Sequence, residues 1–345
     1  MPKIWIISDT HFGAHNNAKK WEDLMCSWMN DYFFPLVCSV FEDGDVLVHL
    51  GDVFDNRQSV SLSSMNIAIN FFERLSSIFN SVYVLCGNHD AYYTTKNDIT
   101  SLECLKHIPN ISVIKDPVSY DLFGKKCLFF PWTENLRYFK KTISDNEPDI
   151  LFCHTEFCGC VMNSSMSKSE NDFDIPNISC IYSGHIHHRQ KYKNVTYAGS
   201  PYQLTQNDRN NTKGVWIFDP VNDKETFQVN DKSPEFIRVK YDDVKEMSLN
   251  DFIKFCDNKF VEVETDSSLM SKCKFQKILS LVQDENIMDL SFVPDKDIVE
   301  KAINIDVSSC LSISDMLDEY IDKFVNCDNI TKKSVKIIAK KLING

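Results

Sequence analysis

The feature that most constrains the fold is a series of short apolar runs, each of which ends in a polar turn. The runs at residues 3–8, 45–50 and 81–86 indicate buried strands, and helical patterns at 21–41 and 63–79 separate them. Strands that alternate with helices predict a sheet with helices packed on its faces. The sequence therefore predicts a layered α/β domain ending near residue 220, with further strands at 126–132, 149–154, 179–184, 194–199 and 214–220.

The chain is long enough for this domain and for smaller units after it. It has 345 residues, of which 43% are hydrophobic, so a sizeable core can be buried. Residues 221–295 mix strand-like and helical runs and predict a small α+β domain. Residues 296–310 are polar and are expected to form a linker, and residues 311–345 carry two amphipathic helical patterns.

Charge and cysteine content limit the function classes. The net charge of −12 argues against a free-standing nucleic-acid binder, although a local surface or a basic partner could still supply affinity. The thirteen cysteines form no paired zinc motif, which favours reduced thiols and a cytoplasmic protein. A structural zinc at Cys153, His154, Cys158 and Cys160 is the alternative, but the spacing matches zinc templates poorly. No signal peptide or membrane span is expected.

Polar side chains follow five of the predicted strands. Ligands of open α/β sheets collect beyond the carboxyl ends of strands, so these side chains are expected to form one site. Imidazoles together with carboxylates and one amide suit manganese, iron or zinc, and one carboxylate can bridge two such ions. The candidate residues are Asp9, His11, Asp52, Asp55, Asn88, His89, Asp90, His154, His185 and His187.

The histidines at 185–188 are expected to face different sides of the chain, because side chains alternate along an extended segment. In an extended segment, residues two apart face the same side, so His185 and His187 are expected to point together into the cleft. His188 faces the other way and is expected at the surface or in a structural role. His49 lies within a strand and is expected to be a satisfied core histidine. Gly184, like Gly51 and Gly87, precedes a candidate ligand and permits a sharp turn.

Taken in order, the motifs D-x-H, GD-x-x-D, GNHD, H and GH-x-H resemble those of the calcineurin-like metallophosphoesterase superfamily. "SDTHFG", "GDVFD" and "YAGSPYQLTQND" narrow the resemblance to the SbcD-type DNA nucleases, with Phe12 in place of a leucine. "PWTEN" and the segment from Cys153 onward are similar to the nuclease subunits of T-even phage recombination complexes. The resemblance implies a four-layer sandwich with a capping domain at 221–295 and a C-terminal helix pair at 311–345.

The resemblance also implies roles for the candidate residues. Two divalent ions are expected, most simply manganese, with magnesium as the other candidate. Asp52 would bridge them and His89 would assist catalysis as a general acid near the phosphate. Asp55 and Arg57 would lie near the DNA backbone. The ligands implied by the resemblance are Asp9, His11 and His187 for one ion, and Asn88, His154 and His185 for the other, with Asp52 shared.

The expected function is that of a metal-dependent DNA exonuclease and endonuclease in recombination, repair and replication. It would cut double- and single-stranded DNA in an SbcCD-like complex, as a nuclease homodimer within a heterotetramer. The helix pair would grip a coiled-coil ABC-type ATPase, and helices around 60–79 and 98–108 would form the dimer contact. The residue usage indicates an AT-rich genome, which suggests a phage or other virus and hence the host cytoplasm.

Two other classes of function stay open. A calcineurin-like phosphodiesterase or phosphatase could act on a small or protein substrate. Asp90 after His89, and Asn56 between Asp55 and Arg57, differ from the GNHE and GD-x-x-D-R-G patterns of the phosphatases and favour the nuclease. A non-catalytic scaffold with the same fold would have lost ligands, whereas this sequence retains all seven.

Overall fold

The computed structural model describes residues 1–162, 165–166, 178–265 and 287–294. The chain divides into two compact units, and the first comprises Met1–Arg238, Met247–Val261 and Val282–Leu290. The predicted linker at 296–310 and the helix pair at 311–345 lie outside the described residues, as do residues 266–286 of the predicted α+β domain. Within the described residues, no helix combines the length and the apolar character that crossing a membrane requires.

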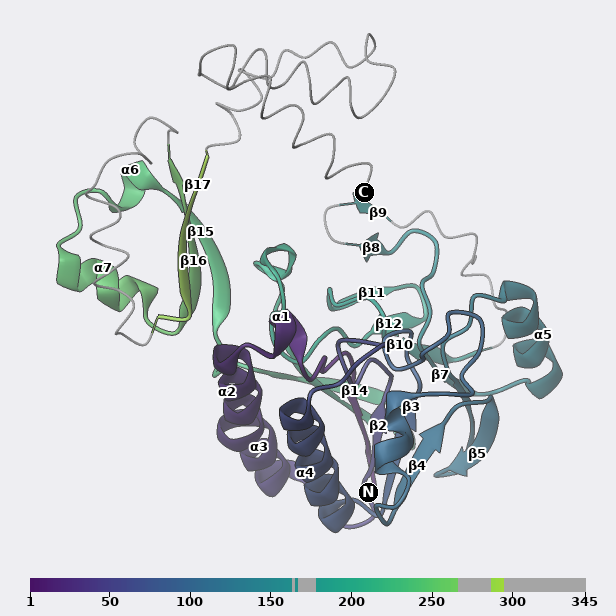
Figure 1. Cartoon of the computed structure of the whole chain (residues 1–345). Coiled ribbons are helices and arrows are strands. Elements are labelled where there is room, and N and C mark those ends of the chain that lie inside the picture. Colours follow the sequence, from purple (N-terminus) through teal and green to yellow (C-terminus); the bar gives the residue numbers. More distant parts are fainter. Residues whose placement is uncertain (163–164, 167–177, 266–286, 295–345) are drawn as a thin grey trace, which may run out of the picture. The chain divides into compact units, whose positions relative to one another are not determined.

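Two six-stranded sheets form the body of the first unit (Figure 1). In the first sheet the central strands are parallel and β13 and β14 are antiparallel additions. Its spatial order is β14 (Lys224–Val229), β13 (Gly214–Asp219), β1 (Ile4–Ile7), β2 (Val46–His49), β3 (Ser81–Leu85) and β4 (Ile111–Ile114).

The second sheet has a parallel centre with an antiparallel strand on each edge. Its spatial order is β11 (Gln190–Tyr192), β12 (Val195–Tyr197), β10 (Cys180–Ser183), β7 (Ile150–Cys153), β6 (Lys125–Phe130) and β5 (Val118–Leu122). Every strand expected from the sequence up to residue 220 is present, and β14 continues the first sheet beyond that point to Val229.

Alternation along the strands builds a four-layer sandwich. Ile4 and Ile6 of β1 belong to the apolar core between the two sheets, whereas Trp5 and Ile7 belong to the core under the helices. On β7, Phe152 faces the core between the sheets and Leu151 faces the outer core of the second sheet. The layers are therefore helices, sheet, sheet and helix, as predicted.

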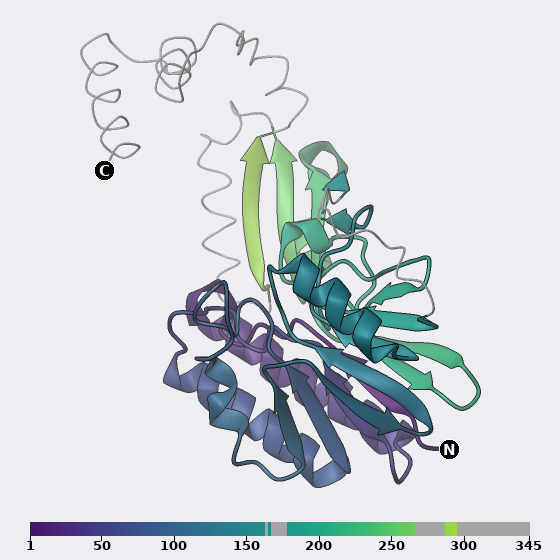
Figure 2. The same cartoon turned by 90° about the vertical axis from the view of Figure 1, so that its right-hand side faces the viewer.

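The helices occupy the two outer faces of the sandwich, as Figures 1 and 2 show. Aromatic and aliphatic side chains of the first three of them join the core on the outer face of the first sheet. The helices are α2 (Lys19–Ser27), α3 (Phe34–Val40) and α4 (Leu62–Ile78) on the first sheet, and α5 (Leu136–Asn146) on the second. A four-residue turn, α1 (Ala14–Asn17), precedes α2.

Three details differ from the expectation. The helix predicted over 21–41 contains a π-helical stretch, Trp28–Phe33, because Pro35 has no N–H for a regular turn. The prediction of a helix over 98–108 was wrong. Only the 3₁₀ turn Ser101–Leu105 forms, because a β-bridge between Ala91 and Thr100 keeps the chain extended up to Thr100. The helix α5 was not expected, since only Phe139 and Ile143 of it are buried.

Residues 235–294 contain a three-stranded sheet with two helices, as expected for an α+β segment. The strands are ordered β15 (Glu235–Lys240), β16 (Lys259–Thr265) and β17 (Asp289–Pro294), with α6 (Tyr241–Val244) and α7 (Leu249–Cys256) between the first two in sequence. A two-stranded ribbon, β8 (Val161–Met162) and β9 (Ser165–Met166), follows the loop after β7. The capping role of 221–295 stays a prediction.

Candidate metal centre

Polar side chains follow the carboxyl ends of β1, β2 and β3 in the first sheet and of β7 and β10 in the second. Since each sheet is parallel there, these ends lie at one edge. The structure gathers their side chains into three groups, in each of which the donor atoms lie within 4.8 Å of one another. The groups are Asp9, His11 and His187; His11, Asp55 and His89; and Asp52, His154 and His185.

In the first group, two imidazole nitrogens face each other. Nε2 of His11 lies 3.0 Å from Nε2 of His187. Nδ1 of His11 donates to Oδ1 of Asp55 at 3.1 Å, so a neutral ring presents a lone pair at Nε2. One oxygen of Asp9 accepts the backbone N–H of His185, and the other, Oδ2, is buried with no hydrogen-bond partner among the described residues. An unpaired buried carboxylate oxygen beside imidazole lone pairs fits a cation ligand set.

Two imidazoles of the third group, His154 and His185, converge on the amide oxygen of Asn88. Nδ1 of His154 donates to the Leu50 carbonyl at 2.8 Å, so a neutral ring turns the lone pair of Nε2 inward. That nitrogen lies 3.0 Å from Oδ1 of Asn88 and 3.3 Å from Oδ2 of Asp52. Nδ1 of His185 lies 2.9 Å from the same Asn88 oxygen. Lone pairs this close repel unless a proton or a cation lies among them, and this donor set suits a divalent metal.

Asp52 belongs to the third group and also lies close to the first group, through His11. Its Oδ2 lies 3.3 Å from Nε2 of His154 and 3.7 Å from Nε2 of His11, which belong to different groups. Its Oδ1 accepts the backbone N–H of His89 at 2.8 Å. The His89 ring is fixed in turn, because its Nδ1 donates to the Asp55 carbonyl at 2.5 Å. Asp52 therefore has the position that a bridging ligand would need.

Burial and neighbouring charges shift the pKa values of the buried acidic and histidine side chains at the centre. Burial raises the pKa of Asp9 and lowers the pKa of His187 to about 3. Burial and then the neighbouring His154 lower the pKa of His185 to about 4. Burial also works against the charge of His154, but the Asp52 carboxylate outweighs it and raises the pKa of His154 to about 9. The Asp52 carboxylate thus favours positive charge at its imidazole neighbours, as a bridging metal ligand would.

The backbone at the strand ends is in an uncommon conformation. Asp9, His11, Asp52 and His185 all have positive φ, between 46° and 77°. Non-glycine residues in this region cost free energy, and such strain clusters at functional sites. Four of the predicted ligands therefore adopt a conformation that packing alone does not favour.

Two glycines allow the close approach of the loops that carry the ligands. A Cβ on Gly87 would lie 2.2 Å from Oδ1 of Asp52. A Cβ on Gly51, which has a φ of +111°, would lie 2.6 Å from Nδ1 of His154. The expectation that glycines before the ligands serve close approach is confirmed at both positions.

The remaining residues that the sequence singled out lie partly in the centre and partly outside it. Asp55 joins the centre through His11, and Arg57 lies half-buried two residues further along the same loop, outside the three groups. His49 is buried and bonds Thr10 Oγ1 at 3.0 Å and the Gly51 N–H at 3.2 Å, which confirms it as a satisfied core histidine. Among the described residues, none of the ligand groups contains a cysteine, and His154 belongs to the centre instead.

Sequence reasoning gave no role to three residues that support the centre. Asp90 is buried and accepts the backbone N–H groups of Val53, Phe54 and Gly87, so it ties the second ligand loop to the third. The ring of Trp132 packs against that of His185, tilted, with centroids 4.9 Å apart. Asp90 directly follows the GNHD histidine and Trp132 ends the apolar run predicted over 126–132, so only their position near the motifs could have indicated them.

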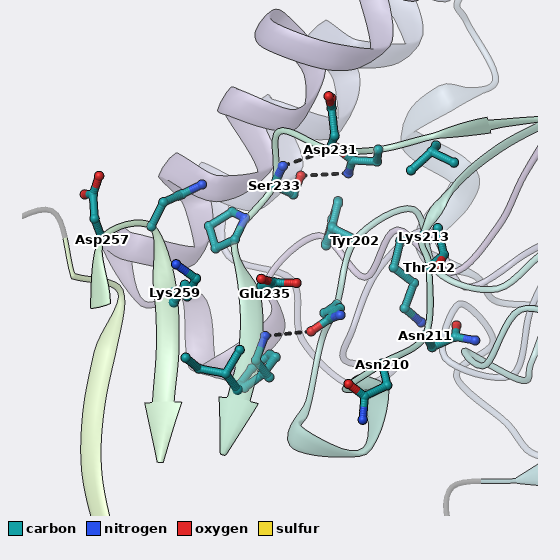
Figure 3. Close-up of a pocket in the computed structure, with 17 residues that line it drawn as sticks. Tyr202, Asn210, Asn211, Thr212, Lys213, Asp231, Ser233, Glu235, Asp257 and Lys259 are labelled. Atoms are coloured by element: carbon teal, nitrogen blue, oxygen red, sulfur yellow. Dashed lines mark hydrogen bonds between the residues drawn. The ribbon is translucent and has the colours of Figure 1, made fainter. Parts of the chain in front are cut away.

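The third supporting residue is Lys213. Its buried ammonium group donates to the His187 carbonyl at 2.5 Å, to Ser200 Oγ at 3.0 Å and to Asp208 Oδ1 at 2.6 Å. It also lines a hollow of about 580 Å³ beside the segments 202–213 and 229–237 (Figure 3). None of the predicted ligands lines that hollow, so its connection to the centre runs through Lys213.

Residues 2–189 match the family described as Calcineurin-like phosphoesterase. This region contains both sheets up to β10 and all the predicted ligands, and it is more than half of the chain. The chain therefore belongs to the calcineurin-like phosphoesterase family, whose members use divalent metals to hydrolyse phosphate esters. The resemblance to calcineurin-like metallophosphoesterases that the sequence motifs indicated is therefore confirmed.

Three curated proteins are similar to this chain in sequence. "Exonuclease subunit 1" of Enterobacteria phage T4 is 26% identical over 231 residues, which are 64% of this chain and 68% of that protein. "Putative phosphoesterase 078R" of Invertebrate iridescent virus 3 is 30% identical over 169 residues, 46% of this chain and 48% of that one. "DNA double-strand break repair protein Mre11" of Methanocaldococcus jannaschii is 23% identical over 367 aligned residues, 98% of this chain and 94% of that one.

Proposed function

We propose that the chain is a metal-dependent DNA nuclease that hydrolyses phosphodiesters with two divalent ions, most simply manganese. The observation that carries the proposal is the pair of donor clusters around Asp52, one with His11 and His187 and the other with His154 and His185. Two relatives are named as an exonuclease subunit and as a double-strand break repair protein, which favours DNA as the substrate.

The proposed ligand sets follow the geometry. Asp9, His11 and His187 would hold one ion, and Asn88, His154 and His185 would hold the other. Two ions held this way would polarise a phosphate, lower the pKa of a water and neutralise the charge that develops on the reacting oxygens. Asp55 orients His11 and the Leu50 carbonyl orients His154, so both rings keep Nε2 turned toward the centre.

His89 is the proposed general acid. The hydrogen bond from its Nδ1 to the Asp55 carbonyl fixes the ring and leaves Nε2 as the nitrogen that can carry a second proton. A protonated Nε2 could donate to the oxygen that leaves phosphorus. The ring lies against that of His11, with centroids 5.0 Å apart, so it belongs to the same edge of the sandwich.

The finer assignments of the complex are part of this proposal. The chain would act as an exonuclease and endonuclease on double- and single-stranded DNA, as a homodimer with a coiled-coil ATPase in an SbcCD-like complex. Residues 221–295 would cap the DNA site and residues 311–345 would bind the ATPase. With a net charge of −12, much of the DNA affinity would come from the partner or a local surface.

The test compares substrates and variants in manganese. The purified chain should degrade linear duplex and single-stranded DNA faster than a chromogenic phosphodiester, and His89→Ala should lose nuclease activity while remaining folded. Exposed His107, changed to alanine, is the matched control and should keep full activity. Wild-type-like DNA cleavage by the His89→Ala protein would contradict the role given to that ring.

The partner needs a separate experiment. A pull-down with a candidate coiled-coil ATPase, followed by nuclease assays with and without ATP, should show binding, and ATP should raise cleavage by the complex above that of the chain alone. No partner binding, together with cleavage that is the same with and without ATP, would overturn the proposed complex. The alternative function, a phosphodiesterase or phosphatase for a small or protein substrate, is favoured if only the chromogenic ester is hydrolysed.

A further inference from the structure

A pocket outside the ligand set lies beside the candidate metal centre. It has a volume of about 300 Å³ and is lined by two segments, residues 95–98 and 130–138, together with residues 115–117. Phe130, Trp132 and Tyr138 give it aromatic walls. We call it the aromatic pocket.

Trp132 connects this pocket to the centre. Its ring packs against that of the predicted ligand His185, tilted by 32° with centroids 4.9 Å apart, and it lies 6.2 Å from the ring of His154. The same side chain lines the pocket. Whatever fills the aromatic pocket is therefore one ring away from a proposed metal ligand.

The walls of the pocket are held in place by backbone contacts. The Asn97 amide group donates to the carbonyls of Lys115 and Trp132, at 3.2 and 3.1 Å, and ties the loop after the GNHD motif to β6. The Trp132 N–H donates to the Cys86 carbonyl at 2.8 Å. On the other wall, Asn135 caps α5 by accepting the Tyr138 N–H. The pocket is thus a preformed feature of the fold.

Charge decides what kind of group fits. Two lysines line the pocket, but Lys96 pairs with Asp98 at 2.5 Å and Lys115 pairs with Glu103 at 2.9 Å. Because these cations are already neutralised, the pocket offers little to a free phosphate. Asp116 also lines the pocket and adds a negative charge, which disfavours a phosphate further. Aromatic walls together with the polar side chains of Thr95, Asn97 and Thr133 suit a flat, uncharged ring that carries hydrogen-bonding edges.

We propose that the aromatic pocket is a subsite for one unpaired nucleobase of the strand whose phosphodiester is being cut. The ring of Tyr138, which is 46% exposed, would stack on the base, while Trp132 would form the wall next to the metal centre. This inference rests on the proposed nuclease function and adds to it a preference for frayed or single-stranded DNA near the scissile bond.

The experiment measures the coupling between the protein ring and the base. Single-stranded oligonucleotides with one abasic residue, placed at each position flanking a cleaved bond, are compared with the intact oligonucleotide in manganese. For the wild type, base removal at one position should lower kcat/KM about tenfold, within the range expected for stacking of one base. In Tyr138→Ala that penalty should disappear, and in Tyr138→Phe, which keeps the ring, it should remain.

A matched control is Tyr192→Ala, because Tyr192 lies on β11 and is exposed to a similar degree, 41%. It should keep the wild-type penalty. An equal penalty in wild type and Tyr138→Ala, or no penalty at any position, would overturn the subsite while leaving the nuclease function intact. A change in oligomeric state on Tyr138→Ala without loss of coupling would identify the pocket as a contact with a second copy and also overturn it.

The failure of the underlying function would look different. If the wild type cleaves no oligonucleotide but hydrolyses a chromogenic phosphodiester, the proposed nuclease function fails and the nucleobase subsite fails with it.

Discussion

The first sheet supplies every carboxylate of the candidate metal centre, whereas the second sheet supplies only imidazoles. Asp9, Asp52 and Asp55 follow β1 and β2, but the strand ends of the second sheet carry His154, His185 and His187. Two of the three groups contain members from both sheets, whereas His11, Asp55 and His89 all follow strands of the first sheet. The negative charge of the centre thus comes from one side of the sandwich, and the neutral ligands come mostly from the other.

Because of this asymmetry, substitutions of ligands from the first sheet and from the second sheet should have different effects. Loss of a carboxylate changes the net charge of the centre and weakens the attraction for any cation. Loss of an imidazole removes one neutral donor and leaves the carboxylates in place. The predictions below test that difference, beginning with the largest expected effect.

The largest effect is expected for Asp52, since its carboxylate faces both clusters. Asp52→Asn keeps the shape but removes the charge, and should lower kcat on a chromogenic phosphodiester about a thousandfold, given several kcal/mol of lost charge stabilisation. Metal analysis should show that both ions bind weakly. Exposed Asp43, changed to asparagine, is the matched control; equal metal content in both variants would contradict a bridging role.

A smaller effect is expected for single imidazoles of the second sheet. His187→Ala and His154→Ala should each lose one of two bound ions and about a hundredfold in activity, because they belong to different clusters. Equilibrium dialysis with manganese, followed by elemental analysis, gives the stoichiometry. If either variant loses both ions, the two clusters do not act as separate sites.

Next comes Lys213, which holds the His187 backbone without being a ligand. Lys213→Met leaves the buried Asp208 carboxylate unpaired and should destabilise the fold by about 3–5 kcal/mol, measured by chemical denaturation. Manganese affinity should fall about 10- to 100-fold, as for other groups that orient a ligand.

The double variant Lys213→Met/Asp208→Asn separates the two consequences of that change. Because no unpaired charge then remains, its loss of stability should be smaller than the sum of the single losses. The loss of manganese affinity should persist, since the His187 carbonyl still lacks its donor. Strict additivity of the stability losses would argue against a coupled pair.

The smallest effect is expected at His49, a buried imidazole on β2 that belongs to neither proposed ligand set. His49→Gln removes its bonds to Thr10 and to the Gly51 N–H, each of which contributes about 0.5–1.5 kcal/mol. Activity should fall only about threefold to tenfold, with two ions still bound. A loss of one ion in His49→Gln would contradict the structural role of His49 and would indicate that it acts on the metal centre.

Much of the fold could be predicted from the sequence because the strands are short, apolar and separated by clear helical patterns. The four-layer arrangement of the family was predicted, and the alternation of Ile4 and Ile6 against Trp5 and Ile7 builds it. The helix α5 was missed because its polar surface hides a stripe of only two buried residues. The helix over 98–108 was wrong because a long-range bridge, Ala91–Thr100, overrides local propensity there.

The sequence by itself determined the types of donor and their order, since each motif directly follows a strand. Only the tertiary structure decided which donors meet. His11 and His187 are 176 residues apart, yet their Nε2 atoms lie 3.0 Å from each other because the two sheets pack face to face. The same packing brought Lys213 against the His187 carbonyl, and the strand order within the second sheet brought Trp132 against His185. Contacts of this kind depend on how buried surfaces fit together, and no local pattern in the chain encodes them.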